Sequence, residues 1–308
     1  MPSSKLIVIA GPTASGKSSL ALTLAEELNG VVINADSMQV YKDIPILAAA
    51  PSEEDASRVP HRLYGIYDAS VNGNMMDWLK LCQKEITEAW KKHQLPIIAG
   101  GTGLYLETLQ KGASPIPETP QKIREKVYQE LNNDGLSALY AELQTIDKET
   151  AARLSPNDTT RIRRAIEVWH HTGKNMTYWQ SIPLQQFYQP DEFISIYINP
   201  PRDELDKRCR IRFDKMVEQG ALIEAEKLLA RHLPDSLPAM HALGVQEFKD
   251  YFAGKYSLNE AIEAAKLHTR QYAKRQSTWF NNRFHADYKY LACYINDKNF
   301  VEDIKKAL

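Results

Sequence analysis

Residues 6–18, Leu6-Ile7-Val8-Ile9-Ala10-Gly11-Pro12-Thr13-Ala14-Ser15-Gly16-Lys17-Ser18, contain the pattern that decides the fold. An apolar run leads into G-x-x-x-x-G-K-S, and a helical pattern begins at Ser18. In this setting backbone N–H groups curl around a polyphosphate, the helix N-terminus adds positive partial charge, and Lys17 supplies a cation. A plain glycine-rich turn would leave Lys17 unexplained. We therefore predict a phosphate site made of Gly11, Pro12, Thr13, Ala14, Ser15, Gly16, Lys17 and Ser18, with Ser18 as the Mg²⁺ ligand.

Strand-like and helix-like segments alternate over the first hundred residues. Short apolar runs at 6–10, 31–33 and 96–99 are separated by helical patterns at 18–28 and 76–92. Apolar strands buried on both faces are typical of a parallel sheet covered by helices. The sequence therefore predicts an α/β fold with a P-loop parallel-sheet core.

The middle of the chain has a different pattern. Prolines at 115, 117 and 120 mark a boundary, residues 121–179 are helical and polar, and strand chemistry returns at 193–198. A helical insertion inside the core is the simplest account. We predict residues 1–114 as the first part of the core, 115–192 as an all-helical insertion, and 193–308 as the completion of the core, with helices at 202–219, 222–230 and 258–280.

The composition is that of an ordinary globular protein. Hydrophobic residues make up 43% and charged residues 25% of the 308 residues, and the formal net charge is -1. This balance argues against wholesale coating of nucleic acid but permits local basic patches. Three distant cysteines, Cys82, Cys209 and Cys293, indicate neither a zinc site nor a disulfide framework. Residues 1–5 lack the features of a signal peptide and no apolar run approaches a membrane span, so we expect a cytoplasmic protein that does not enter a membrane.

A carboxylate follows the second predicted strand, in Val31-Val32-Ile33-Asn34-Ala35-Asp36. The carboxyl ends of parallel strands face the ligand crevice, so Asp36 is expected to point at the phosphate site. It could ligate Mg²⁺ or act as a general base on a second substrate. It could also simply cap the next turn, through Ser37 and Met38.

A second glycine-rich turn, Gly100-Gly101-Thr102-Gly103, follows the strand at 96–99 and precedes a helix. Thr102 carries the only hydroxyl in this turn, so it is a candidate contact to a phosphate oxygen or to a developing charge. The alternative is a tight strand-to-helix turn with no chemical role.

Two helical segments carry clustered basic residues. In the insertion, Arg161 and Arg164 share one face while Ile162, Ile166 and Trp169 form another. Residues 268–280 interleave basic, amide and aromatic side chains at helical spacing. Such residues can neutralise phosphates and stack on splayed RNA bases, although a solvated face or core packing of the aromatic residues would give the same pattern.

Seven motifs, taken in order, resemble those of the bacterial tRNA dimethylallyltransferases, also called tRNA isopentenyltransferases. They are G-P-T-A-S-G-K-S at 11–18, D-S-M-Q-V-Y-K at 36–42, P-H-R-L at 60–63, G-G-T-G-L-Y at 100–105, N-D-x-x-R-I-x-R-A-I-E-V at 157–168, R-x-x-x-R-F-D-x-M at 208–216 and T-R-Q-Y-A-K-R-Q-x-T-W-F at 269–280. The resemblance covers nearly the whole chain, and the order and spacing of the motifs are more specific than any one of them.

This resemblance implies a reaction. The family transfers a dimethylallyl group from dimethylallyl diphosphate to N6 of adenosine at position 37, on the 3′ side of the anticodon, in tRNAs that read codons beginning with U, and diphosphate is released. The resemblance implies that the P-loop at 11–18, a type of loop that often binds nucleotides, holds the isoprenoid diphosphate rather than ATP, with Mg²⁺ near Ser18. Asp36 is then the base, and Thr102 and Arg212 hold the diphosphate, with Arg208 as a further candidate. We also expect a monomer.

The resemblance implies tRNA contacts from the core and from the insertion, which would be a tRNA-binding subdomain. The implied residues are Asp36, Ser37, Met38, Gln39, Thr102, Arg124, Thr160, Arg161, Arg164, His241, Gln246, Lys274, Arg275, Gln276 and Trp279. Some positions depart from the family pattern. Leu47-Ala48-Ala49-Ala50-Pro51 stands where G-T-A-K-P is common, and Gly73-Asn74, Val245 and Asn281 also differ.

Three other classes of protein would account for parts of this sequence. A P-loop kinase or ATPase would bind a nucleotide in the same loop, but it leaves the basic helix at 268–280 unexplained. An adenylate isopentenyltransferase would share the donor chemistry without needing the insertion. A non-catalytic RNA-binding module predicts that Lys17→Ala changes no activity.

Overall fold

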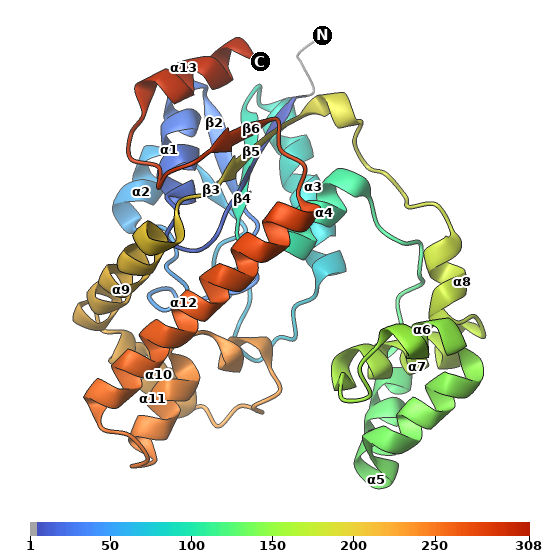
Figure 1. Ribbon diagram of the computed structural model, residues 1–308. Coiled ribbons are helices and arrows are strands. Elements are labelled where there is room, and N and C mark those ends of the chain that lie inside the picture. The colour runs from blue at the N-terminus through green and yellow to red at the C-terminus, as the bar shows by residue number, and fades with distance from the viewer. Residues whose placement is uncertain (1–4) are drawn as a thin grey trace. The chain divides into compact units, whose positions relative to one another are not determined.

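The computed structural model describes residues 5–308 (Figure 1). Residues 1–4, which bear on the expectation about a signal peptide, lie outside the described residues. The chain divides into two compact units: one contains the residues up to Gln110 together with Tyr188–Leu308, and the other contains Lys111–Phe187. The division falls a few residues before each of the predicted boundaries, 114/115 and 192/193.

The first unit contains a parallel sheet whose strands, in the described part of the chain, follow the order β3-β2-β4-β1-β5-β6. The strands are β1 (Leu6–Ala10), β2 (Gly30–Asn34), β3 (His61–Arg62), β4 (Leu95–Gly100), β5 (Phe193–Ile198) and β6 (Tyr288–Tyr290). β1 pairs with β4 on one side and with β5 on the other. The first strand is therefore central, and β5 completes the sheet after the intervening unit.

Both faces of the sheet are covered, as its continuous apolar strands require. On one face, Ile7 and Ile9 pack with residues of α1 (Lys17–Glu27) and α13 (Lys298–Lys306) in one buried cluster. Figure 1 shows α3 (Met75–Lys91) and α4 (Gly103–Lys111) on the other side of the sheet. There the buried Trp78 indole donates to Asn34 O at 2.7 Å and stacks on Tyr105 with ring centroids 4.4 Å apart.

A second apolar core lies beside the sheet in the same unit. Phe213, Met216 and Phe248 pack there with the segment Val40–Leu47. The helices that build it are α9 (Arg202–Glu218), α10 (Ala221–Leu229), α11 (Val245–Phe252) and α12 (Leu258–Arg283), together with the short helix η2 (Pro238–His241). Residues of the loop 43–51 pack into this core, and Glu224 holds the loop directly by accepting the N–H groups of Ile46 and Leu47 at 2.9 and 2.8 Å.

The second unit is helical. It contains α5 (Gln121–Ile146), α6 (Lys148–Arg153), α7 (Thr159–Thr172) and α8 (Met176–Ser181) around a core that includes Val127, Leu143 and Ile166. Gly135 breaks α5 with a φ of 81°, so α5 is two helical segments joined at a kink. Asp147 caps α6 by accepting from Thr150 N, and it also accepts from Thr177. The predicted helical insertion therefore forms a unit with its own core.

Short elements were absent from the sequence prediction. These are β3, β6, α2 (Glu53–Arg58), α11, α13 and the 3₁₀ turns η1 (Pro190–Glu192) and η2. None of the helices in residues 5–308 is long and apolar enough to cross a membrane.

Candidate active site

The phosphate loop connects β1 to α1, as predicted. Gly16 caps α1 with a φ of 97°, which is left-handed, and a Cβ there would lie 2.5 Å from Tyr294 O. Tyr294 N also donates to Ser15 O at 2.9 Å. The segment before α13 thus supports the outer side of the loop, a contact that no sequence motif indicated.

Positive charge converges on a cavity of about 470 Å³ beside this loop. Burial, and next the Arg212 guanidinium, lower the pKa of Lys17 to about 7. Its ammonium donates to Pro12 O at 2.7 Å. Burial also lowers the pKa of Arg212. The cavity lining includes Lys17, Ser18, Arg208, Arg212 and Lys215. Partly buried cations facing one cavity favour an anion between them.

Asp36 lies in a tight turn directly after β2. Its Oδ1 accepts from Met38 N at 2.9 Å, and its own N–H donates to Asn34 Oδ1 at 2.8 Å. The turn-capping alternative for Asp36 is therefore present in the structure. It engages one carboxylate oxygen, and Oδ2 has no hydrogen bond to the protein within residues 5–308. Turn capping and a chemical role are compatible because they use different oxygens.

Thr102 contacts the turn that contains Asp36. Its N–H donates to Ala35 O at 3.2 Å, and its Oγ1 accepts from Ser37 N at 2.9 Å and donates to Ser37 Oγ at 3.2 Å. A Cβ at Gly100 would lie 2.0 Å from Ala35 O, so only glycine permits this approach of β4 to the β2 turn. In this structure Thr102 fixes the Asp36–Ser37 backbone.

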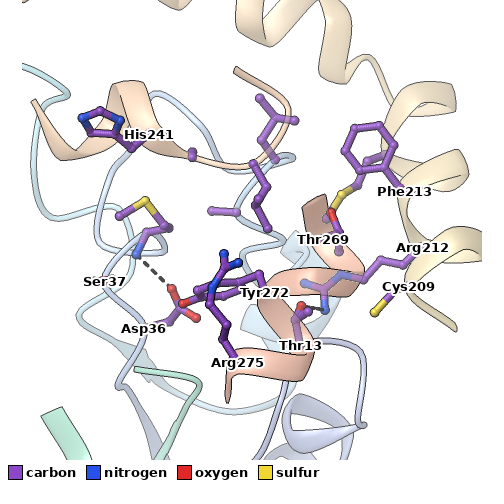
Figure 2. Close-up of a pocket in the computed structure, with 16 residues that line it drawn as sticks. Thr13, Asp36, Ser37, Cys209, Arg212, Phe213, His241, Thr269, Tyr272 and Arg275 are labelled. Carbon is purple, nitrogen blue, oxygen red and sulfur yellow. Dashed lines mark hydrogen bonds between the residues drawn. The ribbon is translucent and has the colours of Figure 1, made fainter. Parts of the chain in front are cut away.

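A second cavity, of about 370 Å³, opens beside Asp36 (Figure 2). Its apolar lining comes from Met38, Leu47, Phe213, Met216 and Leu243 among others. Figure 2 shows Tyr272 and Arg275 next to Asp36, and the hydrogen bond from Arg212 Nη1 to Thr13 Oγ1, 3.1 Å long, on another side of the cavity. Arg212 lines both cavities and joins the cationic site to the carboxylate site.

Most of the apolar lining was missed by the sequence prediction. Phe213 and Met216 fall within the quoted motif R-x-x-x-R-F-D-x-M, which was the available signal for them. Leu47 and Leu243 lie in loops whose position depends on the second core. Lys215 in the cationic cavity had no motif to indicate it.

Helix α12 carries several of the predicted tRNA contacts. Lys274 and Arg275 are exposed, whereas Gln276 is only 6% exposed. Gln276 Oε1 accepts from Thr13 N and its Nε2 donates to Gly101 O, both at 2.8 Å. The amide of Gln276 is thus engaged inside the protein, and its contact with tRNA stays a prediction. Trp279 is partly buried against Gly103, where a Cβ would lie 2.3 Å from the indole.

The remaining predicted contacts of the first unit lie close to the carboxylate cavity or on its loops. His241 is exposed and lines the cavity, and Gln246 is exposed on α11. Ser37 and Met38 line it as well. Gln39 instead donates its amide to Ala48 O and Ala49 O, at 3.1 and 2.7 Å, and so holds the loop whose Leu47 and Ala48 line the cavity.

The predicted tRNA contacts of the helical unit are of two kinds. Thr160 and Arg161 are exposed at the start of α7, where Asp158 caps the helix and contacts Arg161 at 3.2 Å. Arg164 donates to Thr119 Oγ1 at 2.8 Å, and Arg124 is partly buried. Arg164 therefore also contributes to the packing of its own unit.

The fold and the paired cavities define a class: an α/β protein with a phosphate loop, a cationic cavity for a polyphosphate, and an adjoining apolar cavity with a carboxylate. Comparison with known proteins makes this specific. The chain belongs to the IPP transferase family, whose model matches residues 39–283. It is a prenyltransferase that acts on tRNA.

The relatives cover nearly all of the chain. A tRNA dimethylallyltransferase of Nitrobacter hamburgensis is 46% identical over 90% of this chain and 87% of its own, and one of Zymomonas mobilis is 45% identical over 90% and 88%. Among solved structures, the tRNA isopentenylpyrophosphate transferase of Bacillus halodurans has a TM-score of 0.69 and 33% identity, covering 98% of this chain and 95% of its own. A eukaryotic dimethylallyltransferase described as acting on tRNA has a TM-score of 0.79 and 31% identity, covering 90% of this chain and 69% of its own.

Proposed function

We propose that this protein transfers a dimethylallyl group from dimethylallyl diphosphate to N6 of the adenosine at tRNA position 37, 3′ of the anticodon, in tRNAs that read codons beginning with U. The products are N6-(dimethylallyl)adenosine and diphosphate. One observation carries the proposal: the cationic cavity at Lys17 and the carboxylate cavity at Asp36 adjoin at Arg212. A donor and an acceptor can thus meet at that boundary.

The cationic cavity suits a departing diphosphate. When the allylic C–O bond breaks, its electron pair goes to the diphosphate, and Lys17 and Arg212 lie where this charge develops. Ser15 Oγ is buried without a partner among the described residues, which fits a ligand oxygen in the loop. The exposed hydroxyl of Ser18 lines the same cavity and would hold a Mg²⁺ ion carried mainly by diphosphate oxygens. Such an ion would neutralise part of the leaving-group charge.

The carboxylate cavity suits the acceptor. The allylic carbon becomes cation-like as the C–O bond breaks, and apolar neighbours such as Phe213 and Met216 exclude the water that would capture it. N6 then forms the new bond to carbon and loses a proton. Asp36, which lines this cavity, would orient the amine and accept that proton.

The acceptor base must leave its stack to enter this cavity, which costs a few kcal/mol. Exposed Arg275 and His241 line the cavity, and exposed Lys274 precedes Arg275 on α12; these side chains would offset this cost through contacts to the RNA backbone. The exposed Thr160 and Arg161 of the helical unit would add to them. The protein is expected to act in the cytoplasm as a monomer; its three cysteines are free and buried, as suits a reducing compartment.

The test is a transfer assay on the full chain. The protein is incubated with dimethylallyl diphosphate, Mg²⁺ and an anticodon stem-loop with adenosine at position 37, and mass spectrometry follows the gain of one dimethylallyl group. A stem-loop with guanosine at position 37 is the matched control. No mass gain, under conditions in which the protein hydrolyses ATP, would favour a P-loop kinase or ATPase instead.

Asp36→Ala separates the roles of the carboxylate. We expect transfer to be lost while diphosphate binding is retained, because Asp36 faces the second cavity. If diphosphate binding falls as much as transfer does, Asp36 serves the metal rather than the acceptor.

A further inference from the structure

The buried amide of Gln276 connects three parts of the site. It comes from α12, the helix that presents Lys274 and Arg275 to solvent. Its Oε1 accepts from Thr13 N in the phosphate loop and its Nε2 donates to Gly101 O in the second glycine-rich turn, both at 2.8 Å. These partners are 263 and 175 residues away in sequence. One amide therefore joins two loops that the sheet positions separately.

On the donor side, the bond from Thr13 N fixes the residue whose hydroxyl accepts from Arg212 Nη1 at 3.1 Å. The N–H of Thr13 points to Gln276, so other N–H groups of the loop must cradle the diphosphate. Arg212 in turn lies between the two cavities. A movement of Gln276 would thus shift both the loop and the guanidinium at the leaving group.

On the acceptor side, Gly101 immediately precedes Thr102, which fixes the Asp36 turn through Ala35 O and Ser37 N. A Cβ at Gly101 would lie 2.3 Å from Gln276 Nε2 and 3.4 Å from Asp36 Oδ2. Gly101 therefore lies between the Gln276 amide and the Asp36 carboxylate and packs against both.

We propose that Gln276 is a positioning residue that sets the separation between the departing diphosphate and Asp36, and that couples the RNA-facing helix α12 to both. This inference rests on the proposed function. Because reacting atoms must be held within a few ångströms in an aligned geometry, a small change in this separation lowers the rate of transfer far more than it lowers binding of either substrate.

The test compares full-length Gln276→Met and Gln276→Glu with wild type and with Gln219→Met. Methionine keeps the length of the side chain but offers no amide, and Gln219 is an exposed glutamine at the end of α9 that serves as the matched control. We expect kcat to fall about 100-fold in Gln276→Met with KM for both substrates changed only a few-fold, and no change in Gln219→Met. Circular dichroism and thermal melting establish that each variant is folded.

The pH profile distinguishes positioning from loss of stability. In Gln276→Glu a carboxylate can accept from Thr13 N but cannot donate to Gly101 O, whereas the protonated acid can do both. Burial raises the pKa of such a carboxyl group. We therefore expect the ratio of Gln276→Glu to wild-type kcat to rise as the pH falls from 8 to 6, and the ratio for Gln276→Met to stay flat.

Should either variant fold poorly, a double-mutant cycle gives an independent test. Gly101→Ala crowds Nε2, so its effect on kcat should shrink when Gln276→Ala removes the amide. Additive effects, or a flat pH ratio together with Gln276→Met activity equal to that of Gln219→Met, would overturn the proposal. Failure of wild type to transfer the prenyl group would instead reject the proposed function.

Discussion

Lys17 is expected to take up a proton when diphosphate binds. Burial and the neighbouring Arg212 lower its pKa to about 7 from the ordinary 10.5. A bound diphosphate supplies negative charge between the two cations and returns the pKa of Lys17 to its ordinary range. The perturbation is therefore a change of pH between 6 and 8 during diphosphate binding.

The size of the effect follows from the shifted pKa. With a pKa of about 7 in the free protein, Lys17 is about nine-tenths charged at pH 6 and about one-tenth charged at pH 8. Binding should therefore take up about 0.1 proton at pH 6 and about 0.9 proton at pH 8. Lys17 in the free site loses its positive charge as the pH rises through 7. The Kd for diphosphate should therefore be about tenfold higher at pH 8 than at pH 6, which corresponds to ~1.4 kcal/mol of binding free energy.

Isothermal titration calorimetry of inorganic diphosphate with Mg²⁺ measures this uptake, using buffers of different ionisation enthalpy at each pH. Lys17→Arg is the matched control, because arginine stays charged throughout and the ionisation of the ligand itself is common to both proteins. Wild type should take up nearly one proton more than Lys17→Arg at pH 8. Equal uptake by the two proteins would show that Lys17 is already charged in the free site and would refute the reasoning.

Three further substitutions test the framework around the site. Thr102→Val removes the acceptor of Ser37 N–H, so kcat should fall about tenfold, ~1.4 kcal/mol, while the affinity for diphosphate is unchanged. The control Thr102→Ser keeps the hydroxyl and should stay near wild type. An equal loss of initial rate in both variants would contradict this role of Thr102. Glu224→Ala leaves two loop N–H groups without their acceptor and should lower the free energy of unfolding in urea by about 2–3 kcal/mol, whereas an unchanged midpoint would mean that the loop 43–51 is held otherwise. Burial alone would raise the pKa of Asp147, but hydrogen bonds from Thr177 and Thr150 lower it overall, so its stabilisation is present above the ordinary pKa of 3.8 and is lost as the pH falls through the lower folded value. Asp147→Ala should speed amide hydrogen exchange in α6 and α8 at neutral pH, and protection equal to that of wild type in both helices would be inconsistent with this capping role.

The central strands and long helices could be predicted because their own residues determine them. Leu6–Ala10 and Phe193–Ile198 are continuous apolar runs that only a covered sheet can bury. The edge strands β3 and β6 are two and three residues long, and His61–Arg62 has no strand pattern of its own. Such segments become strands because a neighbouring strand offers hydrogen bonds, which is a property of the assembled sheet.

In the site, too, local sequence predicts some residues, whereas the positions of others depend on distant parts of the chain. The G-K-S motif predicts a cation and a hydroxyl at the start of α1, because local backbone geometry places them there. The sequence did not predict the burial of Gln276, because its hydrogen-bond partners Thr13 and Gly101 lie far along the chain. Its neighbours Lys274 and Arg275 give this part of the helix the composition of an RNA-binding helix, which indicated an RNA contact instead. The same limit applies to Arg212, whose contact with Thr13 spans 199 residues.

The support of Gly16 by Tyr294 also bears on synthesis of the protein. The phosphate loop at residues 11–18 is translated well before Tyr294, the residue against which Gly16 rests. Its strand likewise lacks a partner on one side until residues 193–198 have been translated. A chain that ends before Tyr294 lacks this support for the donor cradle, and such prematurely terminated products should bind the isoprenoid diphosphate less tightly than the full chain.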